Sequence, residues 1–235
     1  MAIYVTADLH GISVKEFEEF LQSTGFHNED WLYVLGDVID RNGDGGIGIL
    51  RWLLEQSNVQ LLRGNHEEMM LSCAWVFSEI TASGIEKLSS YHLGLLDQWV
   101  ANGGKVTMEA FKKLLMQDPQ TAREILNYLI DAPLIETVEV GDRVFVLCHA
   151  GLGNFQKDKK LSEYTAHELL WNRPCATDRY FEKATTVFGH TPTWHYGAEG
   201  KAFYTDTWID IDTGAASGGK PMLLRLDDMA EFYME

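Results

Sequence analysis

The sequence predicts an α/β fold in a single domain spanning residues 1–235, with a helical insertion at residues 89–131. The first observation is a strand, a polar loop and a helix repeated three times in the first third of the chain, a pattern typical of a parallel βαβ sheet. The second is a stretch with helical spacing, and with no strand candidate, over the insertion. The third is the return of short strand candidates after residue 135.

The first third alternates apolar runs with amphipathic stretches. Each run ends in a polar loop that contains glycine, and each is followed by apolar side chains that recur every three or four positions. We therefore expect three parallel strands whose crossovers are helices. The strand candidates are Ile3–Ala7, Trp31–Leu35 and Val59–Leu62.

The rest of the chain has a different pattern. The insertion contains helices broken at Asn102-Gly103-Gly104 and at Asp118-Pro119, because glycine and proline end helices. Gly141-Asp142 separates two strand candidates and predicts a hairpin. With a helix at Tyr164–Trp171 between them, the strand candidates should form a second, more antiparallel sheet. These strands are Ile135–Val140, Arg143–Cys148, Thr186–Phe188, Ala202–Tyr204, Trp208–Ile211 and Met222–Leu226.

The net charge and the cysteine content indicate which partners and which cellular compartment to expect. The chain has 19 basic and 35 acidic side chains, a net charge of −16, whereas nucleic acids and anionic membranes bind basic surfaces. We therefore expect neither as a partner. No run approaches the roughly 18 apolar residues of a membrane span, and no signal peptide is visible. Three scattered cysteines without a CxxC pair fit a reduced, cytoplasmic protein. The oligomeric state is left open.

The side chains that could carry chemistry follow five of the strand candidates. Loops at the carboxyl ends of strands converge in α/β sheets, so these side chains should meet in one site. Taken singly, an aspartate after a strand is often a helix cap, and a loop histidine is often a surface group. Their joint placement is what predicts a site. The segments are Asp8-Leu9-His10-Gly11, Gly36–Arg41, Gly64-Asn65-His66-Glu67, His149-Ala150-Gly151 and Gly189-His190-Thr191-Pro192.

Oxygen and imidazole donors in this set indicate a metal site. They suit a borderline-to-hard divalent ion, and the absence of cysteine argues against a structural zinc site. Six donors are too many for one ion that keeps an open position, so two ions are expected, with the carboxylate of Asp37 able to bridge them. Such a pair is the clamp used for displacement at phosphorus. The donors are Asp8, His10, Asp37, Asn65, His149 and His190.

The neighbouring residues suggest further roles. His66 is placed to protonate a leaving oxygen, and Asp40 to hold His66 by a hydrogen bond and keep it cationic. The alternative for Asp40 is a local salt bridge with Arg41, whose planar guanidinium suits phosphate. Glu67 is interpreted as a first-turn charge favoured by the helix dipole. For Asp210 and Asp212, alternation and a following turn predict a structural hydrogen-bonding role.

The motifs D-x-H-G, G-D-x-x-D-R, G-N-H-E, H-A-G and G-H-T-P, in this order, resemble those of the PPP family of metallophosphatases within the calcineurin-like superfamily. The match is closest to its bacteriophage lambda and bacterial-type serine/threonine protein phosphatases, and it covers essentially the whole chain. Further similar segments are Asn102-Gly103-Gly104, Leu170-Trp171-Asn172-Arg173 and Ile211–Ala215. Asn42 stands where the family has glycine, so we expect asparagine to tolerate a left-handed backbone there.

The resemblance implies a fold, a reaction and roles for site residues. The fold would be a two-sheet sandwich with α-β-β-α layers. A hydroxide bridging two ions would attack phosphorus directly, without a phosphoenzyme. His66 paired with Asp40 would be the general acid, and Arg41 and Arg173 would bind the phosphate. The ions would be held by Asp8 and His10 at the first position, by Asn65, His149 and His190 at the second, and by Asp37 at both.

The resemblance also implies substrates and metals. The expected activity is hydrolysis of phosphoserine and phosphothreonine in proteins, with phosphotyrosine and phosphohistidine as further candidates. Manganese is the expected metal, with iron and zinc as alternatives. The rival is a symmetrical dinucleoside tetraphosphate hydrolase, a sister branch that usually lacks the aspartate of D-R and carries G-N-H-D. An inactive phosphate-binding scaffold is the remaining alternative, although every motif residue is present.

Overall fold

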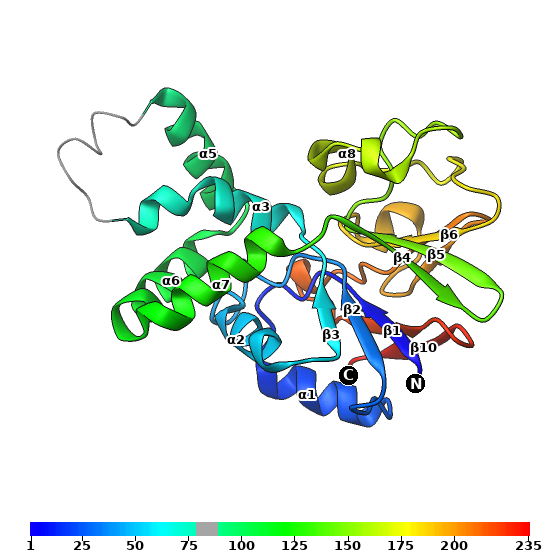
Figure 1. The fold of residues 1–235 in the computed structure, drawn as a ribbon, viewed down its shortest axis with the longest axis horizontal. Helices are drawn as coiled ribbons and strands as arrows, with labels where there is room; N and C mark the ends of the chain where they lie inside the picture. Colours follow the sequence, from blue (N-terminus) through cyan, green and yellow to red (C-terminus); the bar gives the residue numbers. More distant parts are fainter. Residues whose placement is uncertain (79–88) are drawn as a thin grey trace.

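The computed structural model describes residues 1–78 and 89–235. Over these residues, two five-stranded sheets stack face to face and helices cover both outer sides, as expected for an α-β-β-α sandwich (Figure 1). The first sheet has the order β10-β9-β1-β2-β3, and the second has the order β4-β5-β6-β8-β7.

The first sheet combines parallel and antiparallel pairs. Strands β1, β2 and β3 pair in parallel, as the βαβ pattern predicts, and β9 joins β1 in the antiparallel sense with β10 outside it. The prediction for Met222–Leu226 was wrong in its sheet, because this strand lies in the first sheet, and β10 was not predicted. The bounds are β1 Ile3–Thr6, β2 Trp31–Val34, β3 Val59–Leu61, β9 Met222–Arg225 and β10 Ala230–Tyr233.

The second sheet begins with the predicted hairpin of β4 and β5. It is not mainly antiparallel, since β5, β6 and β8 pair in parallel and only the two edge pairs, β4–β5 and β7–β8, are antiparallel. The carboxyl ends of these three central strands therefore point the same way. The bounds are β4 Ile135–Val140, β5 Arg143–Cys148, β6 Thr185–Phe188, β7 Phe203–Tyr204 and β8 Trp208–Asp210.

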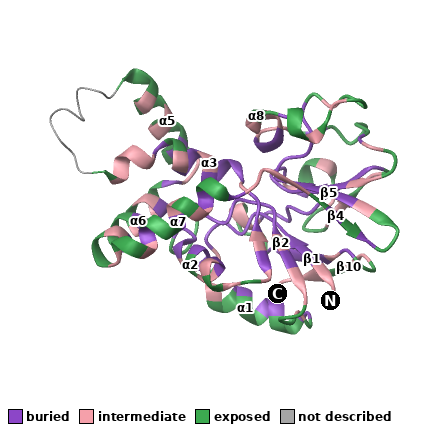
Figure 2. Cartoon of the chain, viewed as in Figure 1, coloured by how far each residue is buried: buried purple, intermediate pink, exposed green. Residues whose placement is uncertain are grey.

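The alternation of side chains along the strands explains the layers. On β1, Tyr4 packs against the outer helices, whereas Val5 faces the second sheet, because successive strand side chains point to opposite faces. Phe145 and Leu147 of β5 belong to the same intersheet core as Val5. Figure 2 shows the buried residues concentrated along the strands and their ends in the middle of the molecule.

Helices flank the first sheet and supply the insertion. Ser13 caps α1 by accepting a hydrogen bond from the Glu16 amide. The breaks predicted in the insertion are confirmed, since α5 ends before Asn102 and Asp118 caps α7 with proline at its first position. Among the described residues, the helices on this side are α1 Val14–Ser23, α2 Ile47–Glu55, α3 Asn65–Ser72, α5 Ser90–Ala101, α6 Lys105–Gln117 and α7 Pro119–Asp131. Helix α8, Ala166–Leu170, packs against the second sheet instead.

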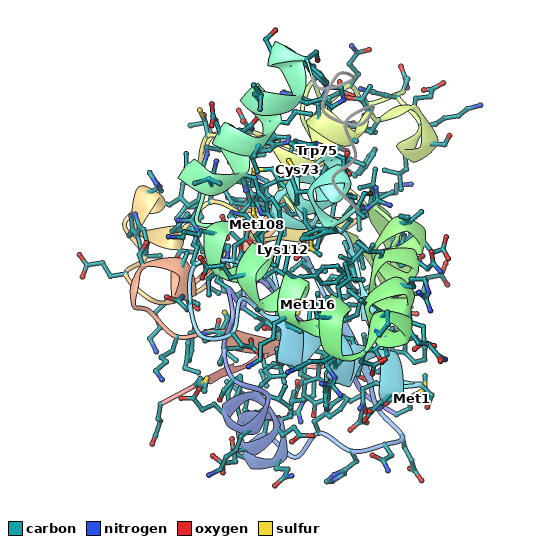
Figure 3. All side chains as sticks on the ribbon, turned by 90° about the vertical axis from the view of Figure 1, so that its left-hand side faces the viewer. Met1, Cys73, Trp75, Met108, Lys112 and Met116 are labelled. Atoms are coloured by element: carbon teal, nitrogen blue, oxygen red, sulfur yellow. The ribbon has the colours of Figure 1, made fainter. Side chains whose placement is uncertain are left out.

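The insertion packs onto the first sheet's helical layer. Trp99, Phe111 and Ile125, one from each of its helices, are fully buried in the same core as Tyr4. Figure 3 shows Met108, Lys112 and Met116 following one another along α6, where Lys112 and Met116 are exposed and Met108 packs partly against the core. One face of α6 is thus part of the core while the opposite face is open.

Among the described residues, no helix combines the length and apolar character needed to cross a membrane.

Candidate metal centre

The loops that follow β1, β2, β3, β5 and β6 bring the six predicted metal donors together. They converge because the first three strands are parallel in one sheet and the last two are parallel in the other. Each donor is at least nine-tenths buried, which is unusual for polar side chains without partners. The six are Asp8, His10, Asp37, Asn65, His149 and His190.

Asp37 lies at the centre of this cluster. One of its carboxylate oxygens, Oδ1, is 3.4 Å from Nε2 of His149, and the other, Oδ2, is 3.7 Å from Nε2 of His10. Among the described residues, two buried triads could hold an ion, and Asp37 belongs to both. The two triads are Asp37 with His10 and His66, and Asp37 with His149 and His190. This arrangement fits a dinuclear centre with Asp37 between the ions.

The other site residues lie close to the triads. Asp8 Oδ1 is 3.9 Å from His10 Nε2, a separation similar to that between His10 and Asp37. Its second oxygen accepts a hydrogen bond from the His190 amide at 2.9 Å. Asn65 Oδ1 is 2.8 Å from Nε2 of His149. The structure therefore brings all six predicted donors together.

The histidine rings are oriented for metal binding. The backbone carbonyls of Ile39 and Leu35 accept hydrogen bonds from Nδ1 of His10 and His149, at 3.0 and 2.8 Å. These bonds place the proton on Nδ1 and leave the Nε2 lone pair facing the carboxylates. His190 Nε2 is buried and has no hydrogen-bond partner in the described structure. Imidazole nitrogens with free lone pairs beside carboxylate oxygens form the environment that a divalent cation fits.

The electrostatics of the site also favour a cation. Burial lowers the pKa of His10 to about 4 and the pKa of His190 well below its usual value, so both rings are neutral and can coordinate. Burial and the neighbouring charges of Asp212 and Asp37 raise the pKa of Asp8 well above its usual value. Bound cations would remove the cost of holding these carboxylates together as anions.

The backbone is strained at the site. Eight non-glycine residues in the described chain have a positive φ, and six of them belong to the site motifs. Such conformations persist only where surrounding contacts enforce them, and they concentrate at functional sites. The six are Asp8, His10, Asp37, Asp40, Arg41 and His190.

Two of the glycines beside the donors are explained by close approach. A Cβ on Gly64 would lie 2.2 Å from Asp37 Oδ1, and a Cβ on Gly189 would lie 2.0 Å from Asp8 Oδ2. Any side chain at these positions would displace a carboxylate. The glycines in the motifs are therefore needed to let the carboxylates of Asp37 and Asp8 pack directly against neighbouring backbone.

His66 and Asp40 form the predicted pair. Nδ1 of His66 donates to Asp40 Oδ2 at 2.6 Å, and both side chains are buried. Burial opposes the charged imidazole, but Asp37 and Asp40 outweigh it and raise the His66 pKa. The alternative of a salt bridge from Asp40 to Arg41 is not seen among the described ion pairs. Asp40 instead accepts the hydrogen bond from His66.

Both predicted arginines face a small cavity above the donors. Its volume is about 120 Å³, and its walls include Arg41, Arg173, His66 and Asn102 as well as the metal donors Asp8 and His190. Both arginines are exposed to solvent. Arg41 Nη2 lies 3.5 Å from His66 Nε2. The cavity thus brings the two arginines and His66 together beside the six predicted metal donors.

Glu67 lies in the first turn of α3, as the sequence predicts, and its carboxylate has a further role that the sequence did not predict. It is fully buried, and its carboxylate accepts hydrogen bonds from the backbone amides of Asp37, Val38 and Gly64 at 2.8–2.9 Å. Burial and Asp37 raise its pKa to about 7. Its side chain turns back from α3 and fixes the loop that carries Asp37. The sequence signal for this role was that Glu67 directly follows Asn65-His66, because a loop that carries metal donors needs hydrogen bonds that fix its backbone.

Two further expectations can be checked. The turn role of Asp210 and Asp212 is confirmed, since Asp210 Oδ1 accepts from the Asp212 amide and Asp212 Oδ1 from the Gly214 amide, each at 2.9 Å. Asp212 in addition lines the cavity. Asn42 is not in the left-handed conformation; the positive φ falls on Asp40 and Arg41 instead. The missing glycine at position 42 therefore imposes no backbone strain.

The sequence also matches known families. The model of the calcineurin-like phosphoesterase family matches residues 1–211, so the chain belongs to the calcineurin-like phosphoesterases. With its two buried His/Asp triads, it is a metal-dependent phosphoesterase hydrolase.

Individual relatives divide between two activities. Serine/threonine-protein phosphatase 1 of Salmonella typhimurium is 28% identical over 233 residues, which covers 95% of this chain and 91% of that protein. A symmetrical bis(5′-nucleosyl)-tetraphosphatase of Chromobacterium violaceum is 25% identical and covers 100% of this chain and 95% of its own length. The relatives therefore leave the substrate class open.

Solved structures support the fold. A protein assigned provisionally as a diadenosine tetraphosphatase superposes with a TM-score of 0.64 at 16% identity, covering 98% of this chain and 91% of that one. A Saccharomyces cerevisiae protein serine/threonine phosphatase gives a TM-score of 0.56 at 14% identity, covering 99% of this chain and 78% of that one.

Proposed function

We propose that the protein is a phosphomonoesterase that removes phosphate from serine and threonine side chains of proteins. The observation that carries this proposal is the buried His66–Asp40 pair at the mouth of the cavity, with Nδ1 of His66 2.6 Å from Asp40. The match to a bacterial protein phosphatase over 95% of the chain supports it.

The leaving group is the physical reason for this choice. Serine and threonine leave as alkoxides, which are poor leaving groups, and a positioned general acid speeds such reactions by about 10²–10⁴-fold. A nucleoside diphosphate leaves readily without a proton. A site in which the buried carboxylate of Asp40 orients His66 is therefore better suited to an alkyl phosphate than to a dinucleotide. Glu67, where the sister branch usually carries aspartate, points the same way.

The residues divide the work as follows. Arg41 and Arg173 bind the phosphate oxygens, and their guanidinium groups suit paired contacts to phosphate. His66 holds a proton on Nε2 for the leaving oxygen, while Asp40 fixes the ring through Nδ1. When bound, two divalent ions supply an activated water and stabilise the phosphoryl oxygens. We propose that Asp8, His10 and Asp37 hold one ion and that Asp37, Asn65, His149 and His190 hold the other, with manganese as the metal.

Comparing substrates tests the proposal. Under manganese, kcat/KM for phosphoserine and phosphothreonine peptides should exceed that for diadenosine tetraphosphate. A strong preference for the dinucleotide would contradict the assignment and favour the tetraphosphatase activity of the other relatives.

The role of His66 has its own test. His66→Asn should lower kcat for a phosphoserine peptide by about 10²-fold or more, with a much smaller loss for 4-nitrophenyl phosphate, whose leaving group needs no proton. Bound metal, measured by elemental analysis, should be unchanged, because His66 lies in one of the two triads but is not one of the proposed ligands. An equal loss on both substrates would remove His66 from the role of proton donor.

A further inference from the structure

The inserted helices reach the proton donor through one short segment. This segment, which we name the elbow, comprises residues 99–107: the end of α5, the turn Asn102-Gly103-Gly104 and the start of α6. We propose that the elbow positions both His66 and Arg41 for the reaction, with Trp99 and Thr107 as positioning residues. The part that concerns His66 rests on its proposed function as proton donor.

The carboxylate of Asp40 is held by the elbow from two sides. Trp99 Nε1 donates to Oδ2 at 2.9 Å, and Thr107 Oγ1 donates to Oδ1 at 2.5 Å. Oδ2 also accepts from His66. Asp40, Trp99 and Thr107 are all fully buried. Because each oxygen has a fixed donor, the carboxylate has one orientation, and this orientation sets the plane of the His66 ring.

The elbow also holds the backbone of the same loop. Asp40 and Arg41 have φ of 72° and 68°, two successive left-handed conformations that cost free energy in side-chain-bearing residues. The Asp40 amide donates to Thr107 Oγ1 at 2.9 Å, and the Arg41 amide donates to the carbonyl of Gly103 at 3.2 Å. Both amides of the strained pair are thus held by the insertion.

The glycines of the turn make this contact possible. A Cβ on Gly103 would lie 2.9 Å from Cγ of Arg41, and a Cβ on Gly104 would lie 2.3 Å from the indole nitrogen of Trp99. Any larger residue at position 103 would push Arg41 aside. Any larger residue at 104 would push Trp99 away from Asp40. The residue types at positions 99, 103, 104 and 107 are therefore each explained by one contact with this loop or within the elbow.

Packing and positioning can be separated at Trp99. Its ring packs edge to face on Phe77, with centroids 6.2 Å apart, and is part of the hydrophobic core. Its N–H alone contacts Asp40. Replacing the indole with a phenyl ring retains most of the apolar contact and removes the donor. Likewise, valine replaces threonine at nearly equal volume and removes the hydroxyl of Thr107.

The experiment uses Trp99→Phe and Thr107→Val as single variants of the whole manganese-loaded protein. We expect kcat for a phosphoserine peptide to fall by about 10- to 100-fold, a part of the general-acid contribution, and kcat for 4-nitrophenyl phosphate to fall by less than about threefold. Thr107→Ser keeps the hydroxyl and should therefore retain the wild-type kcat. In ¹H NMR, the strongly hydrogen-bonded Nδ1 proton of His66 should shift in both variants and stay in place in Thr107→Ser.

Matched controls lose the same kind of bond elsewhere. Trp52→Phe removes the indole bond to Glu18 on the outer helices, and Thr121→Val removes the hydroxyl bond to Asp118 within the insertion. Neither should change the ratio of the two kcat values. A thermal unfolding scan shows that every variant compared is folded at the assay temperature.

The outcomes separate the two proposals. If His66→Asn is selective for the poor leaving group but Trp99→Phe and Thr107→Val slow both substrates equally or not at all, the elbow is structural only and this inference is wrong. If His66→Asn itself is not selective, the proposed function of His66 is wrong. A selective loss in all three variants, with the NMR shift, supports both.

Discussion

The site is built by two regions that work in different ways. The metal donors lie one to four residues beyond strands of the two sheets, so the sandwich topology itself brings them together. The elbow instead reaches Asp40 from 59 and 67 residues further along the chain, through side chains of inserted helices. We infer that metal binding depends on the sandwich, whereas the proposed orientation of His66 depends on how the insertion is docked.

The largest effect is expected at the centre of the metal cluster. Asp37→Asn replaces the one carboxylate shared by both triads with an amide that bridges poorly, so activity should fall on the order of 10³-fold or more. Bound manganese should fall below two ions per chain in elemental analysis. A variant that still holds two tightly bound ions would contradict the bridging role.

A smaller effect is expected where the sandwich supports the donors. Glu67→Gln replaces Oε2, which accepts from the amides of Asp37 and Gly64, with an NH₂ group that cannot accept. The free energy of unfolding should fall by about 2 kcal/mol. Affinity for manganese should weaken by about tenfold, because the loop of Asp37 is less well fixed.

Denaturant unfolding and metal titration measure these two effects. Glu68→Gln is the matched control, since it removes a neighbouring charge that pairs with Arg63 and leaves the loop of Asp37 untouched. If both variants behave alike, Glu67 acts only through its charge.

The smallest effect tests whether the elbow acts separately from the metal donors. Gly103→Ala should displace Arg41 and raise KM for a phosphopeptide, and the inhibition constant of inorganic phosphate, by about three- to tenfold, the loss of one charge-assisted contact. Bound manganese should stay at the wild-type level. Gly25→Ala is the control, because Gly25 has a similar φ of 78° and open space around it. A loss of manganese in Gly103→Ala would show that the two regions are not separable.

The difference between the regions also explains what the sequence could predict. All six metal donors, His66, Asp40 and both arginines were predicted, and the structure brings them together, because strand ends can be read from apolar runs and adjacent polar residues. Trp99 and Thr107 were not predicted as site residues, because their partner Asp40 is distant in sequence. The sequence of their helices showed only the helical spacing of apolar residues. The first-turn position of Glu67 was predicted but the direction of its side chain was not, because a helix-start glutamate has the same local signature whether its side chain is solvated or turned inward.

The sheets show the same limit. Local patterns predicted β1, β2 and β3 with their parallel order, since each crossover is a short helix. They did not predict that β9 joins the first sheet, because its pairing with β1 joins residues more than 200 positions apart. The short edge strand Ala230–Tyr233 lacks the regular alternation that marks a strand in isolation.

We propose that a dinuclear metal cluster on one side and Arg41, Arg173 and His66 on the other bind a phosphate in the cavity of about 120 Å³. The most direct measurement is a crystal structure with manganese and phosphate, using anomalous scattering at the manganese edge. We expect two anomalous peaks about 3.5–4 Å apart. Asp37 should ligate both ions, and the phosphate should contact Arg41, Arg173 and His66. A single peak, or two ions without Asp37 between them, would contradict this proposal.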